Sequence, residues 1–229
     1  MPTTTEFKTV YGPVASWRYG RSLGIDPVGQ ISTCSFDCVY CQLGAIEKVT
    51  SDRQVFIPTD RLVSDLQDFA PFEVDVVTLS GSGEPTLALN LGDILTQIKN
   101  IAQKPTVVLT NGTLLADAQV RNELAIADRV ALKIDATSPD ELRRVNRPDA
   151  NLNWDAIWQG MAEFSQNYTG KLDIQTMLLW EWNDTQKANY LRLIERLSPH
   201  EIQLNVPKRP KPVNRQLDGS FGVSQGEHG

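Results

Sequence analysis

Three cysteines, Cys34, Cys38 and Cys41, lie in one short segment of the chain and are the residues best suited to chemistry. Their spacing, Cys-x3-Cys-x2-Cys, lets three thiolates converge on one small object such as a corner of an iron–sulfur cubane. An odd count at this spacing argues against a disulfide framework. Because the sequence has no fourth cysteine, one iron of a [4Fe–4S] cluster would keep a position open for a small-molecule ligand.

Zinc is the alternative for these thiolates. A structural zinc site needs four ligands, and histidines usually replace missing cysteines. The sequence contains two histidines, His200 and His228, so one of them would have to complete the site. A zinc site or an inert thiol cluster therefore remains open as the second interpretation of the three cysteines.

The residue before the third cysteine is aromatic, Tyr40, and the whole pattern resembles the signature of the radical S-adenosylmethionine (SAM) superfamily. The longer run from Tyr11-Gly-Pro-Val through Arg-Ser-Leu-Gly-Ile-Asp to the cysteines is similar to one branch of that superfamily. This branch contains poorly characterised iron–sulfur proteins related to the tRNA wyosine-base synthases. The resemblance extends from about Tyr11 to Pro210 and is densest in the first quarter of the chain.

The resemblance implies two cofactors. One [4Fe–4S] cluster per chain would be held by Cys34, Cys38 and Cys41, and SAM would chelate its open iron through the amino and carboxylate groups. An external one-electron donor, similar to flavodoxin or ferredoxin, would reduce the cluster. Reductive cleavage of SAM would then give methionine and a 5′-deoxyadenosyl radical that abstracts hydrogen from a substrate.

The segment Leu79-Ser-Gly-Ser-Gly-Glu-Pro-Thr86 follows a predicted strand, and its glycines would let the backbone approach a ligand closely. Alone it would be an ordinary turn, but Ser82-Gly83-Glu84 resembles the superfamily's Gly-Gly-Glu motif, which binds the SAM amino group. Thr110-Asn111-Gly112 and Val206 resemble segments that line the SAM cleft. The predicted cofactor-binding residues are Tyr40, Ser80, Gly81, Ser82, Gly83, Glu84, Asn111, Lys133, Asp135 and Val206.

Lys133 and Asp135 belong to this set because a buried charge is costly unless it is paired or used. They are candidates for contact with the SAM carboxylate, the ribose or the substrate. A structural ion pair between them is an equally good interpretation of the sequence.

The target of the reaction stays open. All three cysteines are used by one cluster, so no thiolates remain for the auxiliary cluster that wyosine synthases carry. The formal charge of −6 also gives no global attraction to phosphate. A tRNA-modifying enzyme nevertheless remains an alternative to an enzyme with an unidentified substrate, and a zinc-stabilised or electron-transfer module without turnover is a third. The basic residues available for tRNA are Arg143, Arg144, Arg147, Lys208, Arg209, Lys211 and Arg215.

Strands and helices alternate along the chain, which predicts a parallel sheet with outer helices. Six strand–helix units favour an α/β fold of the partial (β/α)6 barrel type. Asp60 and Asp184 are candidate N-caps, and Arg147-Pro148 should interrupt the fourth helical region. We predict strands at 28–33, 74–80, 106–110, 129–135, 171–179 and 201–206, with helices at 60–69, 91–102, 117–125, 139–165 and 184–197.

The later strands alternate polar and apolar residues. Lys133 and Asp135 share one face of their strand, as do Asp173 and Gln175 of the next strand, and Gln203 and Asn205 of the last. Helices need an apolar face to pack against, so the polar set should point into the lumen. A polar lumen indicates a cavity that binds something polar, and an open sheet with one solvated face is the alternative.

The expected organisation is one radical SAM partial-barrel domain at 1–206, with an N-terminal extension at 1–27 and a flexible tail at 207–229. No apolar stretch reaches the roughly 18 residues that a membrane span requires, and the first residues do not resemble a secretory signal. We therefore expect a cytoplasmic protein without a membrane partner.

Overall fold

The computed structural model describes residues 7–207 and Pro212. The predicted tail falls almost entirely outside these residues. In chain order the described elements are β1 (Val10–Ser16), β2 (Gly20–Ile25), β3 (Thr33–Cys34), β4 (Lys48–Val49), α1 (Thr59–Gln67), β5 (Val76–Leu79), a short 3₁₀ helix (Pro85–Leu87), α2 (Leu91–Ala102), β6 (Thr106–Thr110), α3 (Ala118–Leu124), β7 (Arg129–Lys133), α4 (Pro139–Val145), α5 (Trp154–Asn167), β8 (Lys171–Met177), α6 (Asp184–Leu197) and β9 (Glu201–Asn205).

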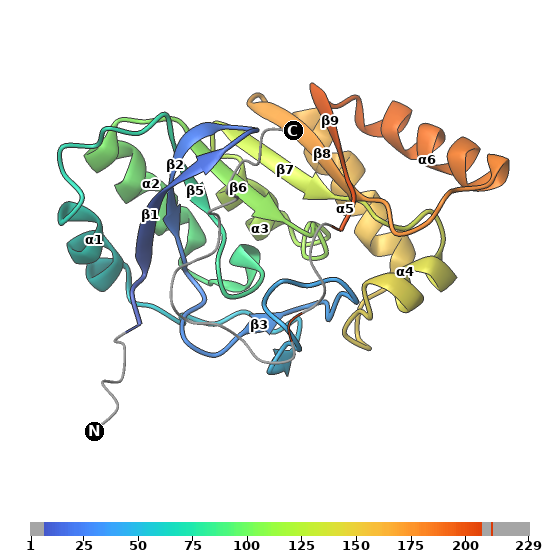
Figure 1. Cartoon of the computed structure of the whole chain (residues 1–229), viewed down its shortest axis with the longest axis horizontal. Helices are drawn as coiled ribbons and strands as arrows, with labels where there is room; N and C mark the ends of the chain where they lie inside the picture. Colours follow the sequence, from blue (N-terminus) through green and yellow to red (C-terminus); the bar gives the residue numbers. More distant parts are fainter. Residues whose placement is uncertain (1–6, 208–211, 213–229) are drawn as a thin grey trace, which may run out of the picture.

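The main sheet has seven strands in the order β1-β2-β5-β6-β7-β8-β9. The pairs from β2 to β9 are all parallel, and β1 is antiparallel to β2. The sheet curls into a half-barrel with helices on its outer side, and the loops around β3 lie beyond the carboxyl ends of the central strands (Figure 1). The predicted partial barrel is confirmed, with six parallel strands.

The start of the chain differs from the expectation. The segment expected as an N-terminal extension contains β1 and β2, and β2 is the first parallel strand of the barrel. The strand predicted at 28–33 is wrong, because only Thr33 of that range is in a strand, β3. Glycine is typical of loops, but Gly24 lies within β2. The ring of Tyr11 lies 2.2 Å from the point where a Cβ on Gly24 would stand, so this strand position has no room for a side chain.

The helices follow the predicted periodicity closely. Both α2 and α6 have the predicted bounds, and the interrupted region forms two helices, α4 and α5. The predicted N-caps Asp60 and Asp184 are wrong. Asn183 caps α6 through a capping box with Gln186, and α1 follows Pro58 without a side-chain cap. Asn183 accepts the bond from a backbone N–H of the first turn, which satisfies one of the unpaired donors there.

The predicted alternation of faces holds for β7 and β8. Leu132, Ile134, Leu172 and Ile174 are buried in the main core. On β9 the expectation fails, because no such core covers its apolar residues: Ile202, Leu204 and Val206 are 43%, 56% and 59% exposed.

Candidate functional site

The cysteine loop begins as a backbone extension of the Gly-rich segment that follows β5. Thr33 donates its N–H to the Ser82 carbonyl at 3.1 Å, and Glu84 donates to the Thr33 carbonyl at 3.0 Å. A Cβ on Gly83 would stand 1.6 Å from the Thr33 oxygen, so only glycine fits there. The predicted close approach is therefore made to the chain's own cysteine strand.

The other side of the cysteine loop is hydrogen-bonded to the end of α4 and to the residue that follows it. Asp37 and Val39 each donate a backbone N–H, at 2.9 Å, to the carbonyls of Asn146 and Val145. Phe36 forms an isolated antiparallel bridge with Pro148. The helix break predicted from Arg147-Pro148 thus supports the loop that carries the thiols.

The three thiols influence one another. Burial raises the pKa of Cys34 well above its usual range, and Glu84, Cys38 and Cys41 add to the rise. Burial also raises the pKa of Cys38 to about 11, which Lys133 partly opposes. Cys38 and Cys41 also line one and the same cavity.

The donor set fits a cluster better than a single ion. Among residues 7–207 and Pro212, no three His, Cys, Asp or Glu side chains are arranged to hold one metal ion. Three cysteine thiolates at the spacing Cys-x3-Cys-x2-Cys suit a multi-iron cluster. His200 precedes β9 at the opposite end of the strands, where its Nδ1 accepts from the Leu172 N–H at 3.2 Å. It therefore does not complete a zinc site, and His228 lies outside the described residues.

The side chains of the Gly-rich segment are used internally. The Ser80 hydroxyl bonds to the Tyr11 hydroxyl at 2.8 Å. The Ser82 hydroxyl donates to Asp26, whose carboxylate also accepts the Ser82 N–H at 2.9 Å. Gly81, with φ of +128°, packs against Asp26. The chain itself therefore fixes the positions of the Ser80 and Ser82 hydroxyls.

Glu84 is buried, and burial raises its pKa. It accepts hydrogen bonds from the Asn111 N–H at 2.7 Å, the Thr110 hydroxyl at 2.5 Å and Thr86. These bonds tie the end of β6 to the Gly-rich segment. Glu84 therefore holds the loop of Asn111 in place, a role that its sequence motif did not indicate.

Lys133, Asp135 and Tyr40 form one network, in which Asp135 and Tyr40 are buried and Lys133 is partly exposed. The Tyr40 hydroxyl donates to Asp135, and the Lys133 ammonium lies 3.8 Å from the same carboxylate and 4.6 Å from the centre of the Tyr40 ring. Asp135 also accepts the Met177 N–H at 2.8 Å. Burial lowers the pKa of Lys133, but Asp135 and the thiolates outweigh burial and raise it. The predicted ion pair exists, and Asp135 is committed to internal contacts.

A cavity of about 400 Å³ opens beside the thiols. Five of the predicted residues line it. The predicted residues that do not line it are Cys34, Asn111, Asp135 and those of the Gly-rich segment from Ser80 to Glu84. Ser80 lines a neighbouring cavity of about 370 Å³, together with Tyr11 and the β1–β2 hairpin. The residues around the first cavity are Cys38, Tyr40, Cys41, Gln42, Lys133, Met177, Val206 and Pro207.

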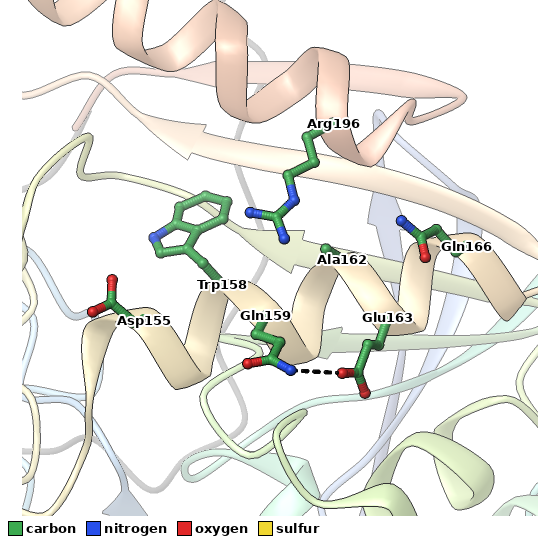
Figure 2. A pocket seen from close by; sticks show the side chains of 7 residues that line it. All are labelled: Asp155, Trp158, Gln159, Ala162, Glu163, Gln166 and Arg196. Atoms are coloured by element: carbon green, nitrogen blue, oxygen red, sulfur yellow. Dashed lines mark hydrogen bonds between the residues drawn. The ribbon is translucent and has the colours of Figure 1, made fainter.

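A third hollow, of about 470 Å³, lies on the outer surface between α5 and α6. Figure 2 shows Arg196 reaching over it from α6 and Trp158 beside it on α5, while Gln159 donates to Glu163 at 3.0 Å. None of the predicted site residues lines this hollow. It belongs to the helix layer and has no contact with the thiols.

The arginines after β7 have partners within the chain, which favours an ordinary solvated face over a phosphate-binding rim. Of the other basic residues considered for tRNA, Lys208, Arg209, Lys211 and Arg215 lie outside the described residues. The pairs are Arg143 with Asp140, Arg144 with the Trp180 ring at 5.1 Å, and Arg147 with Asp37 at 3.5 Å.

Sequence reasoning missed several residues of the site, among them Asn146, Ser35 and Asp26. The Asn146 carboxamide donates to the Cys38 sulfur at 3.3 Å and to Asp135 at 2.9 Å. The Asn111 carboxamide, on the other side, donates to the Cys34 sulfur at 3.6 Å and to the Ser35 hydroxyl at 2.8 Å. Only the position of Asn146 beside the predicted helix break offered a signal.

The fold and the site together define a class: an α/β half-barrel with a thiol loop at the carboxyl ends of its strands. The family model of the radical SAM superfamily matches residues 31–188. A UPF0026 protein of Synechocystis sp. is 58% identical over 215 residues, which cover 94% of this chain and 81% of that protein. A probable GTP 3′,8-cyclase of Saccharolobus islandicus is 28% identical, over 82% of this chain and 58% of the cyclase.

Two solved structures share the fold. The protein anSMEcpe with bound AdoMet has a TM-score of 0.61 at 17% identity, over 82% of this chain and 52% of that one. The methyltransferase TsrM from Kitasatospora setae, with cobalamin and a [4Fe-4S] cluster bound, has a TM-score of 0.55 at 11% identity, over 76% and 35%. The chain thus spans about half the length of these proteins or less. At such identities the likeness shows the fold alone.

This chain belongs to the radical SAM superfamily and, by its relative in Synechocystis, to the UPF0026 group within it. It is an enzyme of that superfamily. The comparisons do not show the expected link to tRNA wyosine-base synthases. No helix within the described part of the chain is both long and apolar enough to cross a membrane.

Proposed function

We propose that the chain binds one [4Fe–4S] cluster through Cys34, Cys38 and Cys41 and cleaves SAM reductively beside it. The observation that carries the proposal is the cavity of about 400 Å³ that Cys38 and Cys41 share with Lys133 and Tyr40. When bound, such a cluster supplies the electron that splits SAM into methionine and a 5′-deoxyadenosyl radical, which takes hydrogen from an unidentified substrate. A flavodoxin- or ferredoxin-like protein provides the electron.

Lys133 supplies the fixed positive charge of this cavity. Its ammonium is held by the Asp135 carboxylate and the face of the Tyr40 ring, so its position is set before a ligand arrives. An ammonium at the wall of a small cavity binds a carboxylate through a charge-assisted hydrogen bond. We assign Lys133 to the SAM carboxylate.

Part of the cavity wall is apolar. Met177 and Val206 line the cavity from the ends of β8 and β9. A thioether and a branched alkyl group pack well against a flat aromatic ring. These residues, with the backbone at Tyr40, provide the surface for the adenine.

Anaerobic reconstitution with iron and sulfide tests the proposal. We expect iron and sulfide in the ratio of a [4Fe–4S] cluster, and release of 5′-deoxyadenosine when dithionite and SAM are added. Tetrahedral zinc in the purified protein, with no cleavage of SAM after reconstitution, would contradict the proposal and favour the zinc-stabilised module.

Lys133→Met tests the assigned carboxylate contact. Because the variant removes a charged hydrogen bond, SAM should bind about tenfold more weakly or worse, while the iron content stays that of the wild type. Lys171→Met is the matched control, since Lys171 is exposed at the amino end of β8. Equal SAM affinity in the wild type and both variants would remove Lys133 from the binding site.

A further inference from the structure

Two buried carboxamides approach the thiols from opposite sides of the cysteine loop. Asn111 follows β6 and donates to the Cys34 sulfur at 3.6 Å, while Asn146 follows α4 and donates to the Cys38 sulfur at 3.3 Å. Both side chains are nearly inaccessible to solvent, with 5% and 1% exposure. Neither residue lines the cavity beside the thiols, so contact with the sulfurs is a role separate from ligand binding.

The surrounding bonds fix which end of each carboxamide faces the sulfur. The Oδ1 of Asn111 accepts from the Thr113 N–H at 3.0 Å, which leaves its Nδ2 for the Ser35 hydroxyl and Cys34. The Nδ2 of Asn146 points at a thiol and at the Asp135 carboxylate. A reversed amide would place an oxygen against these two acceptors, which is unfavourable.

Asn146 keeps this orientation at a cost. Its Oδ1 is buried and, among the described residues, has no hydrogen-bond partner. An unsatisfied buried acceptor is destabilising, and an apolar side chain of similar size would not have one. The N–H groups are therefore the useful part of this residue.

We propose that Asn146 and Asn111 are positioning residues that orient the Cys38 and Cys34 thiolates and raise the reduction potential of the cluster. The inference rests on the proposed function. A reduced cluster carries one more negative charge than an oxidised one, so N–H donors at its sulfurs stabilise the reduced form more. Asn146 should have the larger effect, because its contact is shorter and its side chain is more deeply buried.

A potentiometric titration followed by electron paramagnetic resonance measures this effect on the reconstituted full-length chain. We expect Asn146→Leu to lower the equilibrium constant for reduction about tenfold, which is about 59 mV for one electron. Asn111→Leu should lower it by less.

Asn90→Leu is the matched control. The Asn90 carboxamide donates to the Ile57 carbonyl at 3.0 Å and to the Thr59 hydroxyl at 2.9 Å, and its Oδ1 is also buried without a partner in the described chain. Asn90 thus shares with Asn146 a donating carboxamide and an unsatisfied buried Oδ1, but it is half-buried and has no contact with a sulfur. The Asn90→Leu variant should bind as much iron as the wild type and should have the same reduction potential.

The outcomes separate this inference from the proposed function. If the wild type fails to assemble the cluster, the proposed function fails. If the wild type assembles it and Asn146→Leu and Asn111→Leu load fully with unchanged potentials, the positioning role is wrong. If Asn146→Leu loads no iron, Asn146→Ala replaces it, with the thermal melting of the apo-protein as the check on folding. Failure of both variants to load iron while folded, with Asn90→Leu loading normally, supports the orienting role.

Discussion

The two ends of the half-barrel lumen carry charged side chains from neighbouring strands, yet they are built differently. At the carboxyl end, Lys133 lines an open cavity together with Cys38. At the amino end, the Asp173 carboxylate is fully buried, and it accepts from Arg129 at 2.7 Å and from the Tyr19 hydroxyl at 3.1 Å. Both charges are paired within the chain, but Lys133, paired with Asp135, still lines a cavity, whereas the carboxylate of Asp173 is fully buried.

The β1–β2 hairpin causes the difference. Its turn brings Arg18 to Asn205 and Tyr19 to Gln203, which donates to the tyrosine hydroxyl at 3.4 Å. The hairpin therefore links the first strands of the sheet to β9, the last, as its path across the sheet in Figure 1 illustrates. Burial and the Asp173 carboxylate raise the pKa of Tyr19 to about 12, so its hydroxyl remains a donor. A polar lumen residue is thus a candidate for ligand binding where it still lines a cavity, as Lys133 does, even though the chain supplies it with a partner.

Cys38→Ser should give the largest effect and should be confined to the carboxyl end. Loss of an outer partner of a metal ligand already costs about 10–100-fold, so loss of a ligand should lower SAM cleavage more than about 100-fold. The measurements are iron content and 5′-deoxyadenosine formed after reconstitution. The apo-protein should melt within a few degrees of the wild type, since a hydroxyl replaces a thiol of similar size. A fully loaded, active variant would contradict the assignment of Cys38 as a ligand.

Arg129→Leu, at the amino end, should lower the free energy of unfolding and leave iron loading unchanged. It leaves the Asp173 carboxylate buried without its cationic partner, and removal of one member of a buried pair costs about 3–5 kcal/mol. Urea denaturation of the apo-protein measures this loss. The folded fraction should still load iron as the wild type does.

Arg143→Met is the control for Arg129→Leu. Arg143 pairs with Asp140 on the surface, where both side chains are well exposed, and such pairs contribute at most about 1 kcal/mol. If the two substitutions destabilise the chain equally, the amino-end network is not the structural element that the comparison requires.

The carboxyl end was the more predictable of the two from the sequence. Cys34, Cys38 and Cys41 carry a local pattern, and the periodicity of 91–102 and 184–197 located two helices correctly. Asn146 belongs to no local sequence pattern. Its role in the site depends on a contact with Cys38, which is 108 positions away in the chain. Local periodicity contains no information about contacts at that separation.

The strands β1 and β2 at the amino end were not predicted from the sequence, because their glycines are typical of loops. Gly20 and Gly24 made the first strands look like a loosely structured extension. In the structure, Gly24 accommodates the Tyr11 ring, and Gly20 has a φ of +74° at the end of the hairpin turn. Both glycines are required by the hairpin that contacts β9, so a feature typical of loops here indicates close packing.

Tyr19→Phe should give a smaller effect than Arg129→Leu. It removes one hydroxyl that donates to Asp173 and accepts from Gln203, while the ring and the Arg129 contact above it remain. A lost hydrogen bond of this kind costs about 1–2 kcal/mol, measurable by urea denaturation. Unchanged stability would mean that the hairpin is held by Arg18 and packing rather than by this hydroxyl.

Asp128→Asn should give the smallest effect, and its size should depend on pH. Asp128 lies at the amino end of β7 and accepts from the Lys99 ammonium at 2.6 Å and the Thr106 N–H at 2.8 Å. Burial raises its pKa, but these bonds outweigh burial and lower it. Because the folded pKa lies below the unfolded value of about 3.9, the contribution to stability is present above about pH 4 and is lost as the pH falls through the folded pKa.

Asparagine does not titrate, so the difference in unfolding free energy between wild type and Asp128→Asn should be constant from about pH 7 to pH 5 and shrink below about pH 4. Its size should stay under about 1 kcal/mol, because the pair is partly exposed, with 37% and 41% of the two side chains accessible. Urea denaturation at about pH 7, 5 and 3 measures it, and salt at about 1 M should reduce it further. A difference that grows as the pH falls would mean that Asp128 is destabilised by its burial, which would make the amino end a region of strain instead of one that neutralises its own charges.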